Sequence, residues 1–175
     1  MDGLADLILD ASVAGVPVLG ICFGHQMVAY ALFGSEAVRK SATPEIGWTD
    51  IQVTGEDPLL EGLTDGFNTF ESHFDEVVAS PGMRVFASSE RCAVQAFRVA
   101  GKSIWGVQFH AEMTEGEAVD LLRGVAVLSE LCGREVAARG RFDYRAPARP
   151  KRGVRGVDRG EGVAAHRQAP LREAE

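Results

Sequence analysis

The stretch that most constrains this chain is Gly20–Gly24, whose sequence is G-I-C-F-G. It follows the short apolar run 17–19 and precedes a segment, 25–33, whose composition favours a helix. A strand, a G-x-C-x-G turn and a helix in this order are typical of a nucleophile elbow, here with cysteine in place of serine. We expect both glycines to be needed, because a side chain at either flank would crowd a sharply turned nucleophile. The first N–H groups of the helix would also favour the Cys22 thiolate.

A proton-shuttling partner for this cysteine lies far downstream, in the segment 106–112 with the sequence G-V-Q-F-H-A-E. It follows an apolar strand, and residues two apart in an extended chain point the same way. Glu112 can therefore lie beside His110 and hold its ring in one tautomer while the other nitrogen faces Cys22. The sequence thus predicts a nucleophile, a base and an orienting carboxylate in the order Cys22, His110, Glu112.

Apolar periodicity and turn residues predict an α/β domain around a mixed sheet. The expected helices cover 2–14, 25–33 and 114–131, and the expected strands cover 17–21, 48–53, 67–72, 84–87, 93–99 and 103–109. The apolar face of the first helix is expected to be Leu4, Leu7, Ile8 and Ala11, and that of the last helix Ala118, Leu121, Leu122, Val125 and Leu128. Thr114 is the expected N-cap of the last helix, and Asp57 is the expected N-cap of a short helical turn that begins at Pro58.

Charge divides the chain into two parts. Residues 1–133 carry 7 Lys and Arg against 19 Asp and Glu, whereas residues 134–175 carry 11 against 6. The acidic part is expected to be one domain that does not bind nucleic acid. The Arg-, Gly- and Pro-rich remainder has too few apolar residues to offset its ordering entropy, so we expect a disordered tail. A basic arm that contacts nucleic acid or an acidic partner is the alternative.

Other bulk features favour a cytoplasmic protein. No apolar run approaches the roughly 20 residues that span a bilayer, and the acidic N-terminus does not resemble a secretory signal. The three cysteines, Cys22, Cys92 and Cys132, are too scattered for a disulfide framework or a zinc motif. We therefore expect no metal and no cofactor.

Four motifs together resemble a known family. They are G-I-C-F-G-H-Q at 20–26, E-I-G-W at 45–48, E-S-H-F-D-E-V at 71–77 and G-V-Q-F-H-A-E at 106–112. In this order they are similar to class I glutamine amidotransferases, and most of all to the glutaminase domain of GMP synthase and its stand-alone relatives. The resemblance covers roughly residues 4–130 and implies a three-layer, flavodoxin-like α/β/α fold.

The resemblance also implies an activity and a set of site residues. Cys22 would attack the carboxamide carbon of glutamine and release ammonia, His110 would shuttle protons, and water would then hydrolyse the γ-glutamyl thioester. The backbone N–H of Phe23 would stabilise the oxyanion. Gln26 would lie close to the bound glutamine, and Ser72, His73 and Phe74 would grip its amino and carboxylate ends. Trp48 and His25 are expected to serve packing only.

Three departures from the family pattern bear on activity. Ala111 replaces a usual proline and would loosen the turn that carries the His–Glu pair. The family normally has a further strand–helix–strand region before residue 2, which supplies a second oxyanion N–H, so we expect this chain to represent a truncated domain. No glycine-rich phosphate loop is found, so a separate synthetase chain would have to accept the ammonia.

Two alternative functions stay open from the sequence. One is hydrolysis of a γ-glutamyl peptide or conjugate by the same three residues. The other is a catalytically inactive remnant that acts as a binding or regulatory module, which the missing N-terminal region favours.

Overall fold

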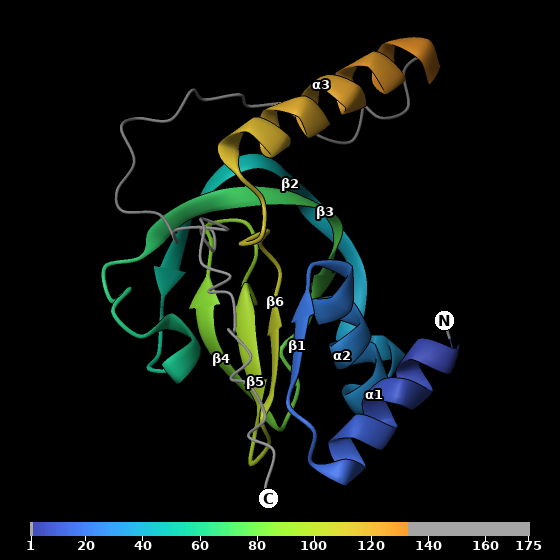
Figure 1. Ribbon diagram of the computed structural model, residues 1–175, viewed down its shortest axis with the longest axis vertical. Helices are drawn as coiled ribbons and strands as arrows, with labels where there is room; N and C mark the ends of the chain where they lie inside the picture. The colour runs from blue at the N-terminus through green and yellow to red at the C-terminus, as the bar shows by residue number, and fades with distance from the viewer. Residues whose placement is uncertain (1, 133–175) are drawn as a thin grey trace, which may run out of the picture.

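A computed structural model of the chain describes residues 2–132 and shows a six-stranded mixed sheet (Figure 1). The strands are β1 (Val18–Ile21), β2 (Val38–Val53), β3 (Phe67–Val77), β4 (Met83–Ser88), β5 (Ala96–Val99) and β6 (Ile104–Val107), and their order across the sheet is β1-β6-β5-β4-β2-β3. The β1–β6 pair is parallel and the other pairs are antiparallel. The predicted α/β class with a mixed sheet is confirmed.

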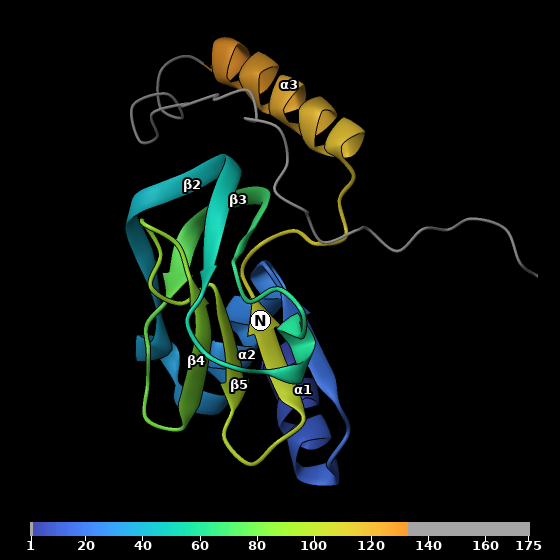
Figure 2. The same ribbon diagram turned by 90° about the vertical axis from the view of Figure 1, so that its left-hand side faces the viewer.

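Helices α1 (Asp2–Ala14) and α2 (Phe23–Phe33) pack against each other on one face of the sheet (Figures 1 and 2). Neighbouring residues of β5 belong to different apolar clusters, since Phe97 packs with the helices and Ala96 packs with Ile51 and Leu60. Successive strand residues point to opposite faces, so each face of the sheet has its own core. Leu60 belongs to the 3₁₀ helix η2 (Pro58–Leu60), which helps to cover the second face. A second 3₁₀ helix, η1 (Ser35–Ala37), links α2 to β2.

The pair β2–β3 is longer than predicted and curls over the upper end of the sheet (Figure 2). The predicted start of β2 at residue 48 is wrong, because the strand begins at Val38. Its early part shows no apolar alternation and is held by long-range pairing with β3, in a ladder that runs from Val38 opposite Val77 to Ile51 opposite Phe67. A bulge between Lys40 and Glu45 bends this ladder. Such bulges tolerate proline, which has no backbone N–H to donate to the neighbouring strand.

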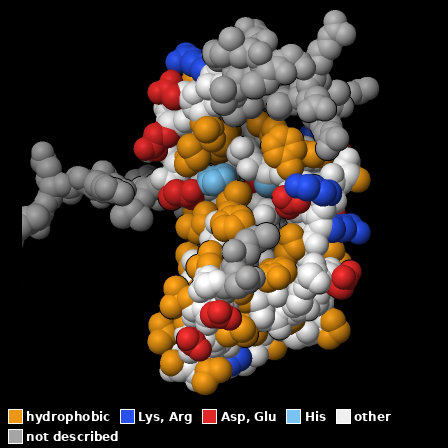
Figure 3. Space-filling model, turned by 90° about the vertical axis from the view of Figure 1, so that its right-hand side faces the viewer, with side chains coloured by type: hydrophobic (Ala, Val, Ile, Leu, Met, Phe, Trp, Pro, Cys, Tyr) orange, Lys and Arg blue, Asp and Glu red, His pale blue; other side chains and the backbone are white. Residues whose placement is uncertain are grey.

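The buried face of α1 also differs from the prediction. Ala5, Ile8 and Ser12 face inward, whereas Leu4 and Leu7 are exposed, Leu7 by 63%. Both sets have helical spacing, and only the narrow stripe that faces α2 can be buried. Figure 3 shows apolar side chains gathered on this side of the molecule.

The predicted helix boundaries hold where local capping decides them. Asp57 caps η2 by accepting a hydrogen bond from the Leu59 N–H at 3.1 Å. Helix α3 (Glu115–Cys132) begins with a capping box, in which the Glu117 N–H donates to Thr114 Oγ1 at 3.3 Å and Glu117 Oε2 accepts from the Thr114 N–H at 2.8 Å. Ala118 is buried and Leu121 is exposed, and the side chains of Val125 and Leu128 lie outside the described part.

The boundary predicted between residues 133 and 134, and the tail that follows, also lie outside the described residues. Within residues 2–132, no helix has the length and apolar character to cross a membrane.

Candidate active site

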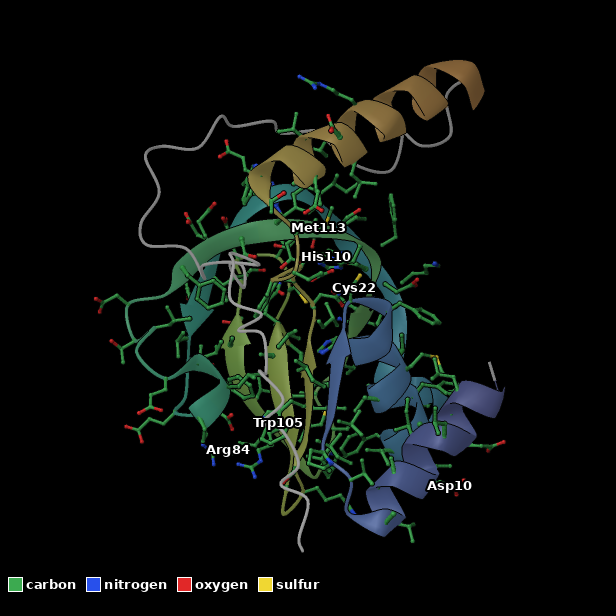
Figure 4. All side chains as sticks on the ribbon, viewed as in Figure 1. Asp10, Cys22, Arg84, Trp105, His110 and Met113 are labelled. Atoms are coloured by element: carbon green, nitrogen blue, oxygen red, sulfur yellow. The ribbon has the colours of Figure 1, made fainter. Side chains whose placement is uncertain are left out.

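Parallel pairing of β1 with β6 brings the cysteine motif and the histidine motif to one edge of the sheet. Gly20 lies opposite Gly106 in the ladder, and the Cys22 N–H donates to the Val107 carbonyl at 2.9 Å. Figure 4 shows Cys22 and His110 at this upper end, far from Arg84 and Trp105. Two motifs more than 80 residues apart in the sequence therefore form one site.

Cys22 occupies the sharp turn that the sequence predicts. It is the one non-glycine residue with positive φ among residues 2–132, at φ 49° and ψ −104°. Backbone in this region costs energy for a side chain and is often kept at functional positions. The turn ends directly in α2, where the Gln26 N–H donates to the Cys22 carbonyl at 3.2 Å.

The two glycines beside Cys22 are not equivalent. A Cβ on Gly20 would lie 2.3 Å from the Gly24 carbonyl oxygen, so this position has no room for a side chain. A Cβ on Gly24 would have no atom within 4 Å. The prediction of crowding is wrong for Gly24, because its substituent would point away from the turn.

The Cys22 sulfur is held by two contacts. Sγ lies 3.8 Å from the Ser72 carbonyl oxygen, and the Gln108 side-chain amide donates to Sγ at 3.6 Å. Burial raises the pKa of the Cys22 thiol above its usual 9.0, although the Phe23 N–H opposes this shift. The Phe23 N–H favours the thiolate, as predicted, but in the unliganded site desolvation has the larger effect on the Cys22 pKa.

His110 and Glu112 form a close pair at the end of β6. His110 Nδ1 lies 2.7 Å from Glu112 Oε1, and their side chains are 17% and 48% exposed. The His110 N–H donates to the Phe70 carbonyl at 2.9 Å, which ties this segment to β3. Within the described residues, the hydrogen bonds of the Cys22 sulfur run to Ser72 and Gln108 and not to His110.

Gln26 and Gln108 connect the elbow helix to the sulfur. The Gln26 amide donates to the Asp75 carbonyl at 3.1 Å and to Gln108 Oε1 at 3.2 Å, while Gln108 in turn donates to Cys22. Sequence reasoning did not single out Gln108. Its position two residues before His110, on the same side of an extended segment, is the signal that could have found it.

The segment Ser72–Phe74 lies beside the cysteine through its backbone. The His73 side chain is buried and points away from solvent, with Nε2 3.1 Å from Glu45 Oε2 and Nδ1 3.0 Å from the Asp75 carbonyl. Phe74 is 38% exposed. Any contact of His73 with a ligand would thus have to come from its main chain.

Glu45, the first residue of the E-I-G-W motif, belongs to this buried region, and Trp48 packs edge-on against Phe70. Among the described residues, Glu45, His73 and Cys92 are the group whose potential ligand atoms all lie within 4.8 Å of one another. Glu45 and His73 are hydrogen-bonded to each other, so we assign no metal to them.

A cavity of about 690 Å³ lies beside η2 and is lined by residues that include Glu56, Leu60 and Arg84. Its lining contains none of the site residues predicted from the sequence. The geometry therefore places the candidate active site at the Cys22 edge of the sheet.

Comparisons with known proteins agree with this fold. The family model for class I glutamine amidotransferases matches residues 2–126, and the chain belongs to this family. A glutamine-hydrolyzing GMP synthase subunit of Saccharolobus solfataricus is 45% identical over 119 residues, which are 67% of this chain and 60% of that relative. The glutamine-hydrolyzing GMP synthase of a Parafrankia strain is 41% identical over 121 residues, which are 68% of this chain and 22% of that protein.

A solved glutamine amidotransferase from Methylobacillus flagellatus superposes with a TM-score of 0.63 at 34% identity, over 74% of this chain and 51% of that one. The chain also spans only about 60% of the length of the Saccharolobus relative.

Proposed function

We propose that this chain hydrolyses glutamine to glutamate and ammonia and delivers the ammonia to a partner synthetase, as in a GMP synthase made of two chains. The observation that carries the proposal is the strained turn at Cys22, which lies against the parallel strand that ends in the His110–Glu112 pair. The family membership and the names of the relatives support the same activity.

We assign the roles as follows. Cys22 attacks the carboxamide carbon, and His110, oriented by Glu112, accepts the thiol proton and passes it to the leaving ammonia. Because burial raises the pKa of the Cys22 thiol, the sulfur stays protonated until substrate binds and His110 takes the proton. The Phe23 N–H, which favours a charged sulfur, is the proposed oxyanion donor.

Substrate contacts are assigned to the same edge. We place the glutamine between Gln26 and the main chain of Ser72, His73 and Phe74, next to the Cys22 sulfur. Gln108 keeps the sulfur and the Gln26 amide in one network. We assign the glutaminase unit to residues 1–133 and the ammonia acceptor to a synthetase partner.

Glutamate release from glutamine tests this proposal. The purified chain should release glutamate, alone or with the synthetase component of a GMP synthase, and Cys22→Ala should abolish the release. Asp50→Asn, an exposed change on β2 away from the sulfur, serves as the matched control and should retain it. A folded chain that releases no glutamate in either setting would favour the binding or regulatory alternative.

A further inference from the structure

A buried group of ionisable side chains behind the Cys22 edge takes no part in the proposed reaction. Glu45 of β2 lies directly opposite His73 of β3, and Glu71 lies two residues before His73 on the same face of β3. The side chains of the three residues are at most 2% exposed. Because water does not reach these three titratable groups, each must be either neutral or paired with an opposite charge.

Glu45 is surrounded by hydrogen-bond donors. Its Oε1 accepts from Ser89 Oγ at 2.7 Å, and its Oε2 accepts from Gln95 Nε2 at 2.8 Å and faces His73 Nε2 at 3.1 Å. A buried carboxylate with three such partners is stabilised as the anion. The hydrogen bonds therefore assign a negative charge to Glu45.

The hydrogen-bond partners of the two His73 ring nitrogens determine its protonation state as well. Nδ1 faces the Asp75 carbonyl at 3.0 Å, and Nε2 faces the Glu45 carboxylate. A carbonyl and an ionised carboxylate only accept hydrogen bonds, whereas a neutral imidazole can donate from one nitrogen alone. Both ring nitrogens must then carry a proton, which makes His73 a cation paired with Glu45.

Glu71 has the opposite surroundings. Neither of its carboxyl oxygens accepts a hydrogen bond of good geometry, although the nearby Gln95 side chain partly favours the anion, and Oε2 lies 3.6 Å from His73 Nε2. Burial, followed by the charge of Glu45, raises the pKa of Glu71 well above its usual value. Gln95 Oε1 nearby is also without a donor, and a proton on Glu71 would supply one.

We propose that the cluster holds one ion pair, Glu45⁻ with His73⁺, and that Glu71 is a neutral carboxylic acid whose ionisation would oppose thiolate formation at Cys22. Among residues 2–132, the other titratable groups near the cluster include Cys22 and also His25 of α2 and Cys92, of which the last two are buried. Burial keeps His25 neutral, with a pKa of about 3, and raises the pKa of Cys92 to about 12. Neither adds a charge near neutral pH, so the cluster is neutral overall.

The link to the reaction runs through β3. Ser72, between Glu71 and His73, presents its carbonyl oxygen 3.8 Å from the Cys22 sulfur. A negative charge on Glu71 raises the pKa of the Cys22 thiol. Glu71 in its neutral form thus lets the sulfur ionise when substrate binds; this link rests on the proposed function, whereas the charge states do not.

Two matched substitutions separate the buried acids. Glu71→Gln replaces a neutral acid by a neutral amide, so it should leave the folding equilibrium constant at pH 7 unchanged or raise it. Because the folded pKa of Glu71 is raised, the contribution of Glu71 to wild-type stability falls as pH rises above the usual value of 4.5, by at most tenfold per pH unit. The stability of the wild type relative to Glu71→Gln should therefore fall over this range. Glu45→Gln leaves His73⁺ unpaired and should lower the constant by a factor of about 100 or more. A Glu71→Gln variant that loses more than tenfold would overturn the proposal.

Alkylation of Cys22 by iodoacetamide reports the charge near the sulfur without any need for glutamine turnover. Glu71→Gln should shift the pH profile of alkylation to lower pH, since it removes the charge that Glu71 gains at high pH. Glu76→Gln, on the same strand but paired with Arg39 at 2.7 Å, should leave the profile in place. Identical profiles for wild type and Glu71→Gln would refute the electrostatic link, whereas a glutaminase assay that fails would count against the proposed function alone.

Nitrogen-15 NMR of the histidine rings tests the ion pair directly, even where Glu45→Gln does not fold. The chain has four histidines, and loss of one signal in His73→Gln identifies His73. Both His73 ring nitrogens should carry protons at pH 7. A neutral ring would contradict the proposal, and so would a stoichiometric metal ion in the purified chain, found by elemental analysis and lost in Glu45→Gln.

Discussion

At the scale of single residues, Gly20 and Gly24 flank the same cysteine with different surroundings. Gly20→Ala would drive a Cβ to 2.3 Å from the Gly24 carbonyl oxygen. We expect it to lower the free energy of unfolding by at least about 1–3 kcal/mol, the usual cost of overpacking, as measured by urea denaturation.

Gly24→Ala is the matched control for this change. Its Cβ would meet no atom within 4 Å, and the residue lies inside α2, where alanine is favoured over glycine by roughly 0.5–1 kcal/mol. The variant should be as stable as the wild type or slightly more stable. Equal losses in both variants would show that the turn is not packed as described.

His25 gives the stability of the protein an acid dependence. Burial lowers its pKa from 6.5 to about 3, although the backbone at Gly106 and Val94 opposes the shift. The stability that comes from a neutral His25 is therefore complete above pH 6.5 and is lost as pH falls toward 3, by at most about 1.4 kcal/mol per pH unit.

The difference between wild type and His25→Leu isolates this contribution from that of the carboxylates. In urea denaturation between pH 7 and 4, the unfolding free energy of the wild type relative to the variant should decrease as pH falls. Parallel losses in the two proteins would mean that His25 ionises without penalty, against its complete burial.

At the scale of elements, the start of α3 depends on one local device. Thr114 and Glu117 cap the helix reciprocally, and loss of such a cap costs about 1 kcal/mol. Thr114→Ala should therefore speed hydrogen exchange of the first amides of α3 several-fold.

Thr114→Ser keeps the hydroxyl and is the control for the cap. It should preserve the exchange rates of the wild type. If alanine and serine gave the same rates, another contact would have to fix the start of the helix.

Local sequence signals explain where the helices begin and end. The ends of α1 and α2 and the cap of α3 follow from residues next to them in the chain, such as Gly34 with φ 91° at the end of α2. The early half of β2 does not, because residues 38–47 become a strand only by pairing with β3. Sequence periodicity carries no information on a partner about 30 residues away.

At the scale of the whole molecule, α1 and the edge strand β1 carry uncovered apolar side chains. Leu7 and Val13 of α1 are 63% and 88% exposed, and Leu19 of β1 is 49% exposed. Apolar patches of this kind favour association. The double variant Leu7→Lys, Val13→Lys should therefore bind less of the hydrophobic dye ANS and sediment more uniformly than the wild type.

Asp10→Lys provides the matched control, since it adds positive charge to the same helix without removing apolar surface (Figure 4). It should leave dye binding close to that of the wild type. Equal dye binding by the double variant would show that another surface is responsible.

Some residues of the candidate site could be predicted from the sequence and others could not, as was the case for the fold. Cys22, His110 and Glu112 could be predicted because each lies in a short motif whose spacing has a local physical meaning. The contacts of Glu45 and Gln108 could not be recognised, because they join residues 50 and 86 positions apart in the chain.

The sequence by itself determined the α/β class, the elbow at Cys22, the His110–Glu112 pair and the family to which the chain belongs. These depend on periodicity, glycine placement and spacing within a few residues. The tertiary structure alone decided which glycine is crowded, that burial raises the pKa of the Cys22 thiol, and that Glu45, His73 and Glu71 meet behind the site. These three findings depend on desolvation and on contacts between atoms that the sheet brings together. No single segment of the chain encodes desolvation or such contacts.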